Sequence, residues 1–201
     1  VRELLGEGRA VTGVRLANGQ ALQADVVVLA AGAWSGALAR TAEVPLDVRP
    51  VRGQILLLHG APGALDRTVN DGDGYLVPRE DGRILVGSTM EDAGFEAITT
   101  PEALVELRRV AERLLPATAD MREEMAWAGL RPGTADRLPF LGPVAERPGL
   151  ILATGHYRNG ILLAPITAQL VADCVAGREP ACDLRPFAAR SVDPAAALIV
   201  P

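Results

Sequence analysis

The residues from Val26 to Ala31 form an apolar run without any polar alternation, and the run ends at Gly32. A strand with one solvated face alternates apolar and polar residues, whereas a strand covered on both faces is apolar throughout. We therefore expect a buried strand here, of the kind found in α/β folds. The sequence also predicts a short helix over residues 36–41, with Ser35 as its N-cap.

A second apolar run, over 150–153, ends at Thr154-Gly155 and leads through a polar loop with Arg158 into an apolar helix over 160–176. A strand, a loop and a helix N-terminus in this order present backbone N–H groups and a cation to an anion. A second arginine, Arg131, lies upstream in a loop over 129–134. Together the two segments predict a pocket for a small carboxylate beside a cofactor.

The residues between these segments follow a different pattern. A strand over 45–58 and a hairpin over 74–90 precede an amphipathic helix over 101–115, which has Pro101 at its first position. We divide the chain into part of a cofactor domain (1–44), an antiparallel substrate-binding domain with one helix (45–130), a return to the cofactor domain (131–190) and a fraying tail (191–201). The fold class is α/β with an α+β substrate part.

Composition excludes several classes of function. The net charge is −5 and the 20 basic residues form no block, which argues against a nucleic-acid partner. Cys174 and Cys182 lack companions at metal-ligand spacing, and His59 and His156 are the only histidines, so we expect no metal. No run reaches membrane-spanning length and no signal peptide is visible, which predicts a cytoplasmic protein. Because the sequence starts at Val1, we expect the C-terminal part of a longer protein or one piece of a split one.

Several segments resemble one family. The motifs Gly129-Leu-Arg-Pro-Gly-Thr-Ala-Asp-Arg-Leu-Pro-Phe-Leu-Gly142 and Gly155-His-Tyr-Arg-Asn-Gly-Ile-Leu-Leu-Ala-Pro165 resemble the two C-terminal motifs of the glycine oxidases, FAD-dependent amine oxidases of the D-amino-acid oxidase family. The residues over 74–79 and 86–90 are similar to that family's substrate-domain hairpin, and those over 26–35 to its second flavin-domain strand. The resemblance covers residues 1 to about 190.

The resemblance implies the C-terminal portion of a two-domain FAD-dependent oxidoreductase. The family begins with a strand–Gly-x-Gly-x-x-Gly–helix unit, which is missing here, because Gly6-Glu7-Gly8 lacks the third glycine and fits a turn. We therefore expect that an N-terminal FAD-binding half is required as a partner. A homo-oligomer is left open.

The activity implied by the resemblance is oxidative deamination of glycine or a small amino acid. A hydride passes from the substrate α-carbon to flavin N5, O2 then accepts the electrons and gives H2O2, and the product feeds thiazole formation in thiamine synthesis. No side chain is assigned a catalytic role, because the cofactor supplies the chemistry. The alternatives are a sarcosine oxidase or D-amino-acid dehydrogenase of the same family, or a non-catalytic fragment or subunit that needs a partner for FAD.

The resemblance implies that Arg131 and Tyr75 bind the carboxylate of the substrate amino acid. It also implies that Arg158 lies near the substrate and the flavin, and that Met90 forms a wall of the pocket. Each residue also has a structural interpretation: a salt bridge of Arg131 to Asp136, local carbonyl contacts of Arg158, and packing of the other two. The residues assigned to the cofactor are Val1, Gly32, His156, Tyr157, Arg158, Asn159, Gly160, Ile161 and Leu162. The structural alternative for 156–162 is a plain strand-to-helix loop. We expect His156 to be structural and Trp34 and Trp127 to be packing residues.

Overall fold

The computed structural model describes residues 1–190, and the predicted fraying tail, 191–201, lies outside the described residues. The chain divides into two compact units. Unit 1 comprises Val1–Pro50 with residues 131–190, and unit 2 comprises Val51–Leu130. Within residues 1–190, no helix combines the length and apolar character needed to cross a membrane.

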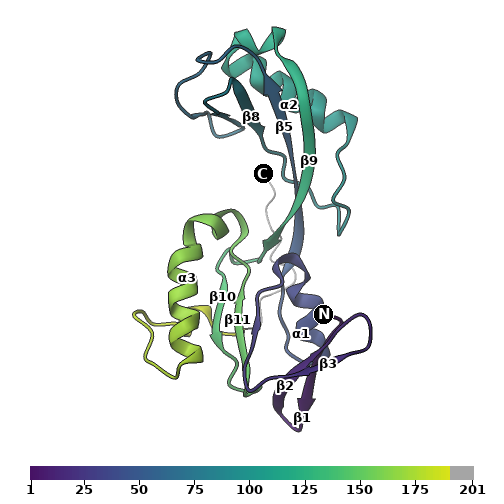
Figure 1. Ribbon diagram of the computed structural model, residues 1–201, viewed down its shortest axis with the longest axis vertical. Coiled ribbons are helices and arrows are strands. Elements are labelled where there is room, and N and C mark those ends of the chain that lie inside the picture. The colour runs from purple at the N-terminus through teal and green to yellow at the C-terminus, as the bar shows by residue number, and fades with distance from the viewer. Residues whose placement is uncertain (191–201) are drawn as a thin grey trace. The chain divides into compact units, whose positions relative to one another are not determined.

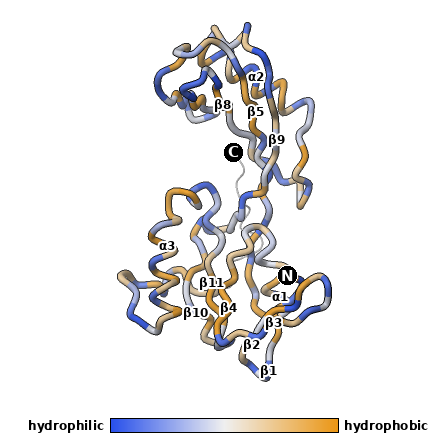
Figure 2. Tube along the Cα trace, viewed as in Figure 1, coloured by the Kyte–Doolittle hydropathy of each residue, from blue (hydrophilic) through white to orange (hydrophobic). Residues whose placement is uncertain are grey.

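Unit 1 is built on a short mixed sheet (Figure 1). Strand β11 (Leu150–Thr154) lies at its centre, parallel to β4 (Val27–Leu29) and antiparallel to β10 (Phe140–Pro143). Helix α3 (Gly160–Val175) contacts β10 and β11. Figure 2 colours β4 and β11 as hydrophobic, in agreement with the apolar runs from which these strands were predicted. Phe140 and Leu152 are fully buried and form part of the core of this sheet.

A second sheet in unit 1 is antiparallel, in the order β1 (Glu3–Glu7), β2 (Ala10–Arg15) and β3 (Ala21–Gln23). The 3-10 turn η1 (Gly32–Trp34) and helix α1 (Ser35–Thr41) follow β4, and α1 contacts β1. Buried residues from this sheet and helix join the core of the mixed sheet, among them Leu4, Val11 and Ala39. The last described turn is η4 (Arg185–Phe187).

Three expectations for the region around β4 are not met within residues 1–190. The run 26–31 is not covered on both faces, because Val28 is 39% exposed while Leu29 is 3% exposed. Within residues 1–190, β4 is an edge strand, and its open face lines a cavity of about 720 Å³ together with Val1 and Trp34. Trp34 is 53% exposed in the described chain, which does not fit the expected packing role either. Ser35 does not cap α1: the helix starts at Ser35 itself, and no side chain caps it.

Unit 2 is an antiparallel sheet with a helix on one face (Figure 1). The strand order is β6 (Val69–Asn70), β7 (Tyr75–Pro78), β8 (Arg83–Gly87), β5 (Arg49–His59) and β9 (Arg122–Gly133). Helix α2 (Pro101–Leu114) begins at Pro101 as predicted, after an N-cap at Thr100. Its predicted apolar face buries Leu107 and Ala111 against Leu56, Leu58 and Leu76 of the sheet, and the turn η2 (Pro116–Asp120) follows.

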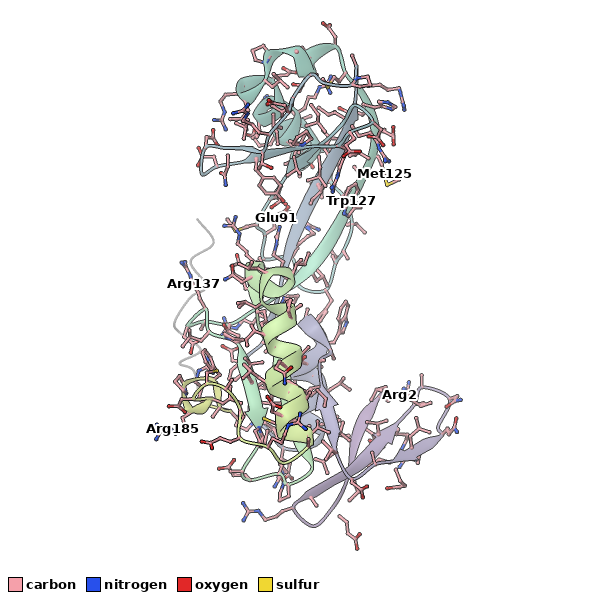
Figure 3. The ribbon with its side chains drawn as sticks, turned by 60° about the vertical axis from the view of Figure 1, so that its left-hand side comes forward. Arg2, Glu91, Met125, Trp127, Arg137 and Arg185 are labelled. Carbon is pink, nitrogen blue, oxygen red and sulfur yellow. The ribbon has the colours of Figure 1, made fainter. Side chains whose placement is uncertain are left out.

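Strand β9 differs from its prediction in extent and in burial. It continues through Arg131 to Gly133, so Arg131 lies in a strand rather than in the expected loop. In the described chain β9 is an edge strand, and it carries the exposed side chains Met125 and Trp127 (Figure 3). Trp127 is 38% exposed, which does not fit the expected packing role.

Candidate cofactor and substrate site

The carboxyl ends of the parallel strands β4 and β11 are tied together by buried hydroxyl groups. The Ser35 hydroxyl donates to Thr154 Oγ1 at 2.8 Å, and the Thr154 hydroxyl lies 3.2 Å from the carbonyl oxygen of Gly32. Both side chains are buried, with 0% of Ser35 and 2% of Thr154 exposed. Open α/β sheets bind their ligands outside the carboxyl ends of parallel strands. These bonds therefore place Gly32 and the loop that follows Thr154 at the position where such a fold binds a ligand.

The Arg131 segment packs against the same loop. Gly155 has φ 81°, and a Cβ added to it would lie 2.8 Å from Thr134 Cγ2, so only glycine permits this approach. Thr134 is fully buried and directly follows β9, which carries Arg131. The two sequence motifs are thus in contact within unit 1 through Gly155 and Thr134. Asp136, the alternative partner considered for Arg131, accepts hydrogen bonds from Arg190 at 2.7 and 2.9 Å.

The start of α3 presents apolar side chains and open backbone. The turn η3 (Tyr157–Asn159) leads directly into the helix, and Ile161 and Leu162 are 95% and 78% exposed. A Cβ at Gly32 would meet nothing within 4 Å, and a Cβ at Gly160 would meet only His156 Cβ at 3.6 Å. Open glycine backbone together with an exposed apolar helix start fits close approach by a flat ring system such as that of FAD.

His156 is engaged inside unit 1. Its Nε2 lies 3.0 Å from Thr167 Oγ1 on α3, and its burial lowers its pKa below the ordinary value. A neutral imidazole that is hydrogen-bonded to the helix holds the loop in place. This geometry agrees with a structural role for His156.

Val1, another residue of the predicted cofactor set, lies at the start of unit 1. It lines the cavity beside β4 together with Val28 and Trp34. This cavity is mostly apolar in lining and belongs entirely to unit 1.

Unit 2 carries the other two predicted substrate residues at one end of a hairpin. Tyr75, the first residue of β7, lies opposite Gly87, the last residue of β8. A Cβ at Gly87 would collide with Cζ and the hydroxyl oxygen of Tyr75, so the phenol ring lies across the glycine. Met90 follows three residues after Gly87 and is half-buried. The hairpin therefore brings Tyr75 and Met90 to the same end of the sheet.

Several residues support the site in ways that the sequence did not predict. Ser35 and Thr154 hold the strand ends, Thr134 supports Gly155, and Gly87 supports Tyr75. The glycines carried a signal, because a glycine at the end of a strand often marks close approach of another group. No sequence signal linked Ser35 to Thr154, because the two residues lie 119 positions apart.

Comparison with known proteins defines the class of this chain. A family profile described as "DAO: FAD dependent oxidoreductase" matches residues 1–174. The chain therefore belongs to the DAO family of FAD dependent oxidoreductases, as the resemblance predicts.

Individual relatives narrow the similarity to the glycine oxidases. The chain is 47% identical to a glycine oxidase of Pseudomonas aeruginosa over 188 residues, which is 94% of this chain and 51% of that protein. It is 46% identical over 158 residues to the bifunctional protein ThiO/ThiG of Synechocystis, which is 76% of this chain and 23% of that protein. The crystal structure of the Geobacillus kaustophilus glycine oxidase matches with a TM-score of 0.90 at 35% identity, over 96% of this chain and 52% of that one. The chain thus spans about half the length of the glycine oxidases that it matches.

The hydroxyl pair at the strand ends gives a first prediction. Thr154→Val removes the acceptor of the buried Ser35 hydroxyl, and we expect a loss of about 1–3 kcal/mol in the free energy of unfolding. Ser35→Ala should relieve much of this loss in the double variant, with a coupling energy of roughly 0.5–3 kcal/mol. Urea unfolding of the four proteins measures this coupling, and additive effects would contradict it.

The burial of His156 predicts how stability depends on pH. Its pKa is lowered in the folded chain, so as pH falls below about 6.5 the unfolded chain takes up a proton that the folded chain resists. We expect the stability of the wild type to fall over this interval, and the His156→Asn variant to lack this part of the fall. Urea unfolding at several pH values between about 7.5 and 5.5 tests this, and parallel curves for the two proteins would be the opposite result.

Proposed function

We propose that this chain is the substrate-side half of a glycine oxidase, and that it takes part in FAD-dependent oxidative deamination of glycine or a similarly small amino acid. The observation that carries the proposal is the contact of the Arg131 segment with the loop before α3, at the carboxyl ends of β4 and β11. Through this contact the segment that carries Arg131 and the exposed first turn of α3 belong to the same unit. The similarity to glycine oxidases supports the choice of substrate.

Within this proposal each residue has a defined task. Arg131 binds the amino acid's carboxylate through its planar guanidinium, which can donate two charge-assisted hydrogen bonds. For the other three residues we propose the tasks that the resemblance implies: a hydroxyl donor to a substrate carboxylate for Tyr75, a cation close to the substrate for Arg158, and a wall of the substrate pocket for Met90. Residues 156–162, Gly32 and Val1 form this chain's share of the cofactor site.

The chemistry that FAD supplies when bound is removal of a hydride from the substrate α-carbon, with O2 as the final acceptor and H2O2 as product. This chain's residues orient the α-carbon and hold the carboxylate, which is how a protein contributes to cofactor chemistry. Since one relative is a bifunctional ThiO/ThiG protein, we also propose a role in thiazole formation for thiamine, in the cytoplasm.

A partner half is part of the proposal. The chain spans about half of the matched glycine oxidases, and the β4 face and the α3 start expose Val28, Trp34, Ile161 and Leu162. An exposed apolar surface of this kind is typical of an interface. We propose that a segment equivalent to the unmatched half of those enzymes covers it and supplies the remaining FAD contacts.

Reconstitution tests the proposal. The chain is co-produced with the unmatched half of the Pseudomonas aeruginosa glycine oxidase, and the purified complex is examined for flavin absorbance and for peroxide formation with glycine, sarcosine and D-alanine. We expect retained flavin and peroxide from glycine. A flavin-free, inactive complex would support the non-catalytic alternative.

Two substitutions at opposite ends of α3 make this test specific. Ile161→Asp places a carboxylate on the exposed start of the helix, where we expect it to abolish flavin retention. Val175→Asp, at a residue that is 48% exposed at the far end of the same helix, should leave flavin retention unchanged. Equal effects of the two variants would remove the support for a cofactor at the helix start.

The task of Arg131 gives a separate prediction. Loss of a bidentate charged hydrogen bond of about 1.5–3 kcal/mol should raise KM for glycine roughly ten- to a hundredfold in Arg131→Ala. Binding of FAD should change little. Arg67→Ala is the matched control, because Arg67 is 79% exposed and pairs with the neighbouring Asp66. Equal losses of glycine and FAD affinity in Arg131→Ala would contradict a carboxylate-binding role.

A further inference from the structure

The connection between β8 and α2, residues 88–100, has little secondary structure of its own. It contains one isolated bridge, from Arg52 to Glu91, and one turn. It also carries Met90 and the exposed side chains Phe95 and Ile98. Connections of this length without regular structure are commonly functional, and their position has to be fixed by contacts from outside.

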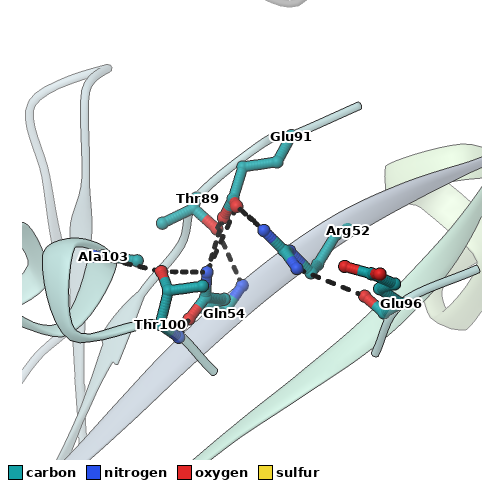
Figure 4. A network of polar contacts seen from close by, with 7 residues as sticks. All are labelled: Arg52, Gln54, Thr89, Glu91, Glu96, Thr100 and Ala103. Atoms are coloured by element: carbon teal, nitrogen blue, oxygen red, sulfur yellow. Dashed lines mark hydrogen bonds and ion pairs between the residues drawn. The ribbon is translucent and has the colours of Figure 1, made fainter. Parts of the chain in front are cut away.

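Strand β5 supplies these contacts through Arg52 and Gln54 (Figure 4). The backbone of Arg52 exchanges two hydrogen bonds of 2.9 Å with Glu91. Arg52 Nε and Nη2 also donate to Glu91 Oε2, at 3.0 and 2.5 Å, and Gln54 Nε2 donates to Glu91 Oε1 at 2.9 Å. The Thr89 hydroxyl bonds to the same carboxylate. Met90 therefore lies between two residues that are both held by β5.

The same two side chains reach the rest of the connection. Arg52 Nη1 donates to the carbonyl oxygen of Glu96 at 3.4 Å. Gln54 Oε1 accepts from the backbone N–H of Thr100 at 2.7 Å, and Thr100 is the N-cap of α2. The beginning, the middle and the end of the connection are thus all fastened to β5.

The contacts are charged and partly buried, with 26% of the Glu91 side chain exposed. Gln54 is fully buried and Arg52 is 8% exposed. Burial opposes ionisation of Glu91, but hydrogen bonds from Thr89, Arg52 and Gln54 outweigh it and hold the pKa of that carboxyl below its usual value. A buried ion pair adds little net stability compared with apolar residues of the same size, but it fixes geometry, because a displaced partner leaves a buried charge unpaired.

We propose that Arg52, Gln54 and Glu91 form a latch that fixes the position of Met90, and that the latch thereby determines the size of amino acid the pocket accepts. These three are positioning residues, which act through the 88–100 connection and not on the reacting atoms. The proposal rests on the proposed function, since Met90 is a pocket wall only in that function.

Kinetics of the reconstituted complex test the effect on specificity. In Arg52→Ala and Glu91→Gln we expect KM for glycine to rise about tenfold with kcat changed by less than about threefold, and kcat/KM for D-alanine relative to glycine to increase. Arg52→Lys keeps the charge but not the double contact, and should give an intermediate substrate preference.

The matched control is Arg108→Ala. Arg108 lies on α2 in the same unit and donates to the carbonyl oxygens of Ala119 and Met121, both at 2.9 Å. Its loss should lower the thermal midpoint without changing KM or the preference between glycine and D-alanine. If the latch variants change only the thermal midpoint, as Arg108→Ala should, the latch is merely structural and the proposal is wrong.

Hydrogen exchange on the chain alone gives a readout independent of flavin and activity. The amides of Thr89 and Glu91, which donate to the Gln54 and Arg52 carbonyl oxygens, should lose protection in Arg52→Ala and Glu91→Gln but keep it in Arg108→Ala. Unchanged protection would overturn the latch, and lost protection with unchanged substrate preference would overturn its link to specificity. A wild-type complex that oxidises no amino acid would overturn the proposed function and the specificity claim with it, while hydrogen exchange would still decide whether the connection is latched.

Discussion

The parallel pairing of β4 with β11 is the interaction on which the candidate site depends. It places Val27 opposite Leu150 and Leu29 opposite Leu152, and the Val27 N–H donates to the Gly149 carbonyl oxygen at 2.7 Å. These residues come from two pieces of unit 1 that are separated in sequence by the whole of unit 2. Closing so long a loop costs chain entropy, which the burial of Leu29, Leu150 and Leu152 helps to offset. Once the strands pair, their ends bring Gly32, Thr154 and the start of α3 together.

Local patterns predicted the elements well, because local chemistry decides where an element starts and which period it follows. Pro101 predicted the start of α2, and the amphipathic pattern over 101–115 predicted that one face is buried, which is the face that carries Leu107 and Ala111. The burial of Val28 could not be predicted in this way, because it depends on whether a distant segment covers the outer face of β4. The prediction that Ser35 caps its own helix was wrong for the same reason. Its hydroxyl bonds to Thr154, 119 residues away, and not to a backbone N–H of the helix.

The sequence predicted the motifs of the candidate site but not the contacts that hold these motifs in place. The loop over 154–162 and the Arg131 motif stand out as sequence patterns, whereas the contact of Gly155 with Thr134 that joins them is visible only in three dimensions. Arg52 and Gln54 did carry a signal, because polar residues inside an otherwise apolar strand need buried partners. The partner, Glu91, lies in an irregular connection for which no periodicity predicts a position. The assignments of individual site residues remain predictions.

The position of Tyr75 over Gly87 has a consequence for the thermodynamics of ligand binding. The ring rests on the backbone of the neighbouring strand, so its orientation is set before any ligand arrives. A side chain that has already given up its rotational freedom during folding does not lose it again when a ligand binds. A hydrogen bond from this hydroxyl to a ligand would therefore form with little loss of conformational entropy. The absence of a side chain at Gly87 is what makes this possible, because it leaves room for the Tyr75 ring.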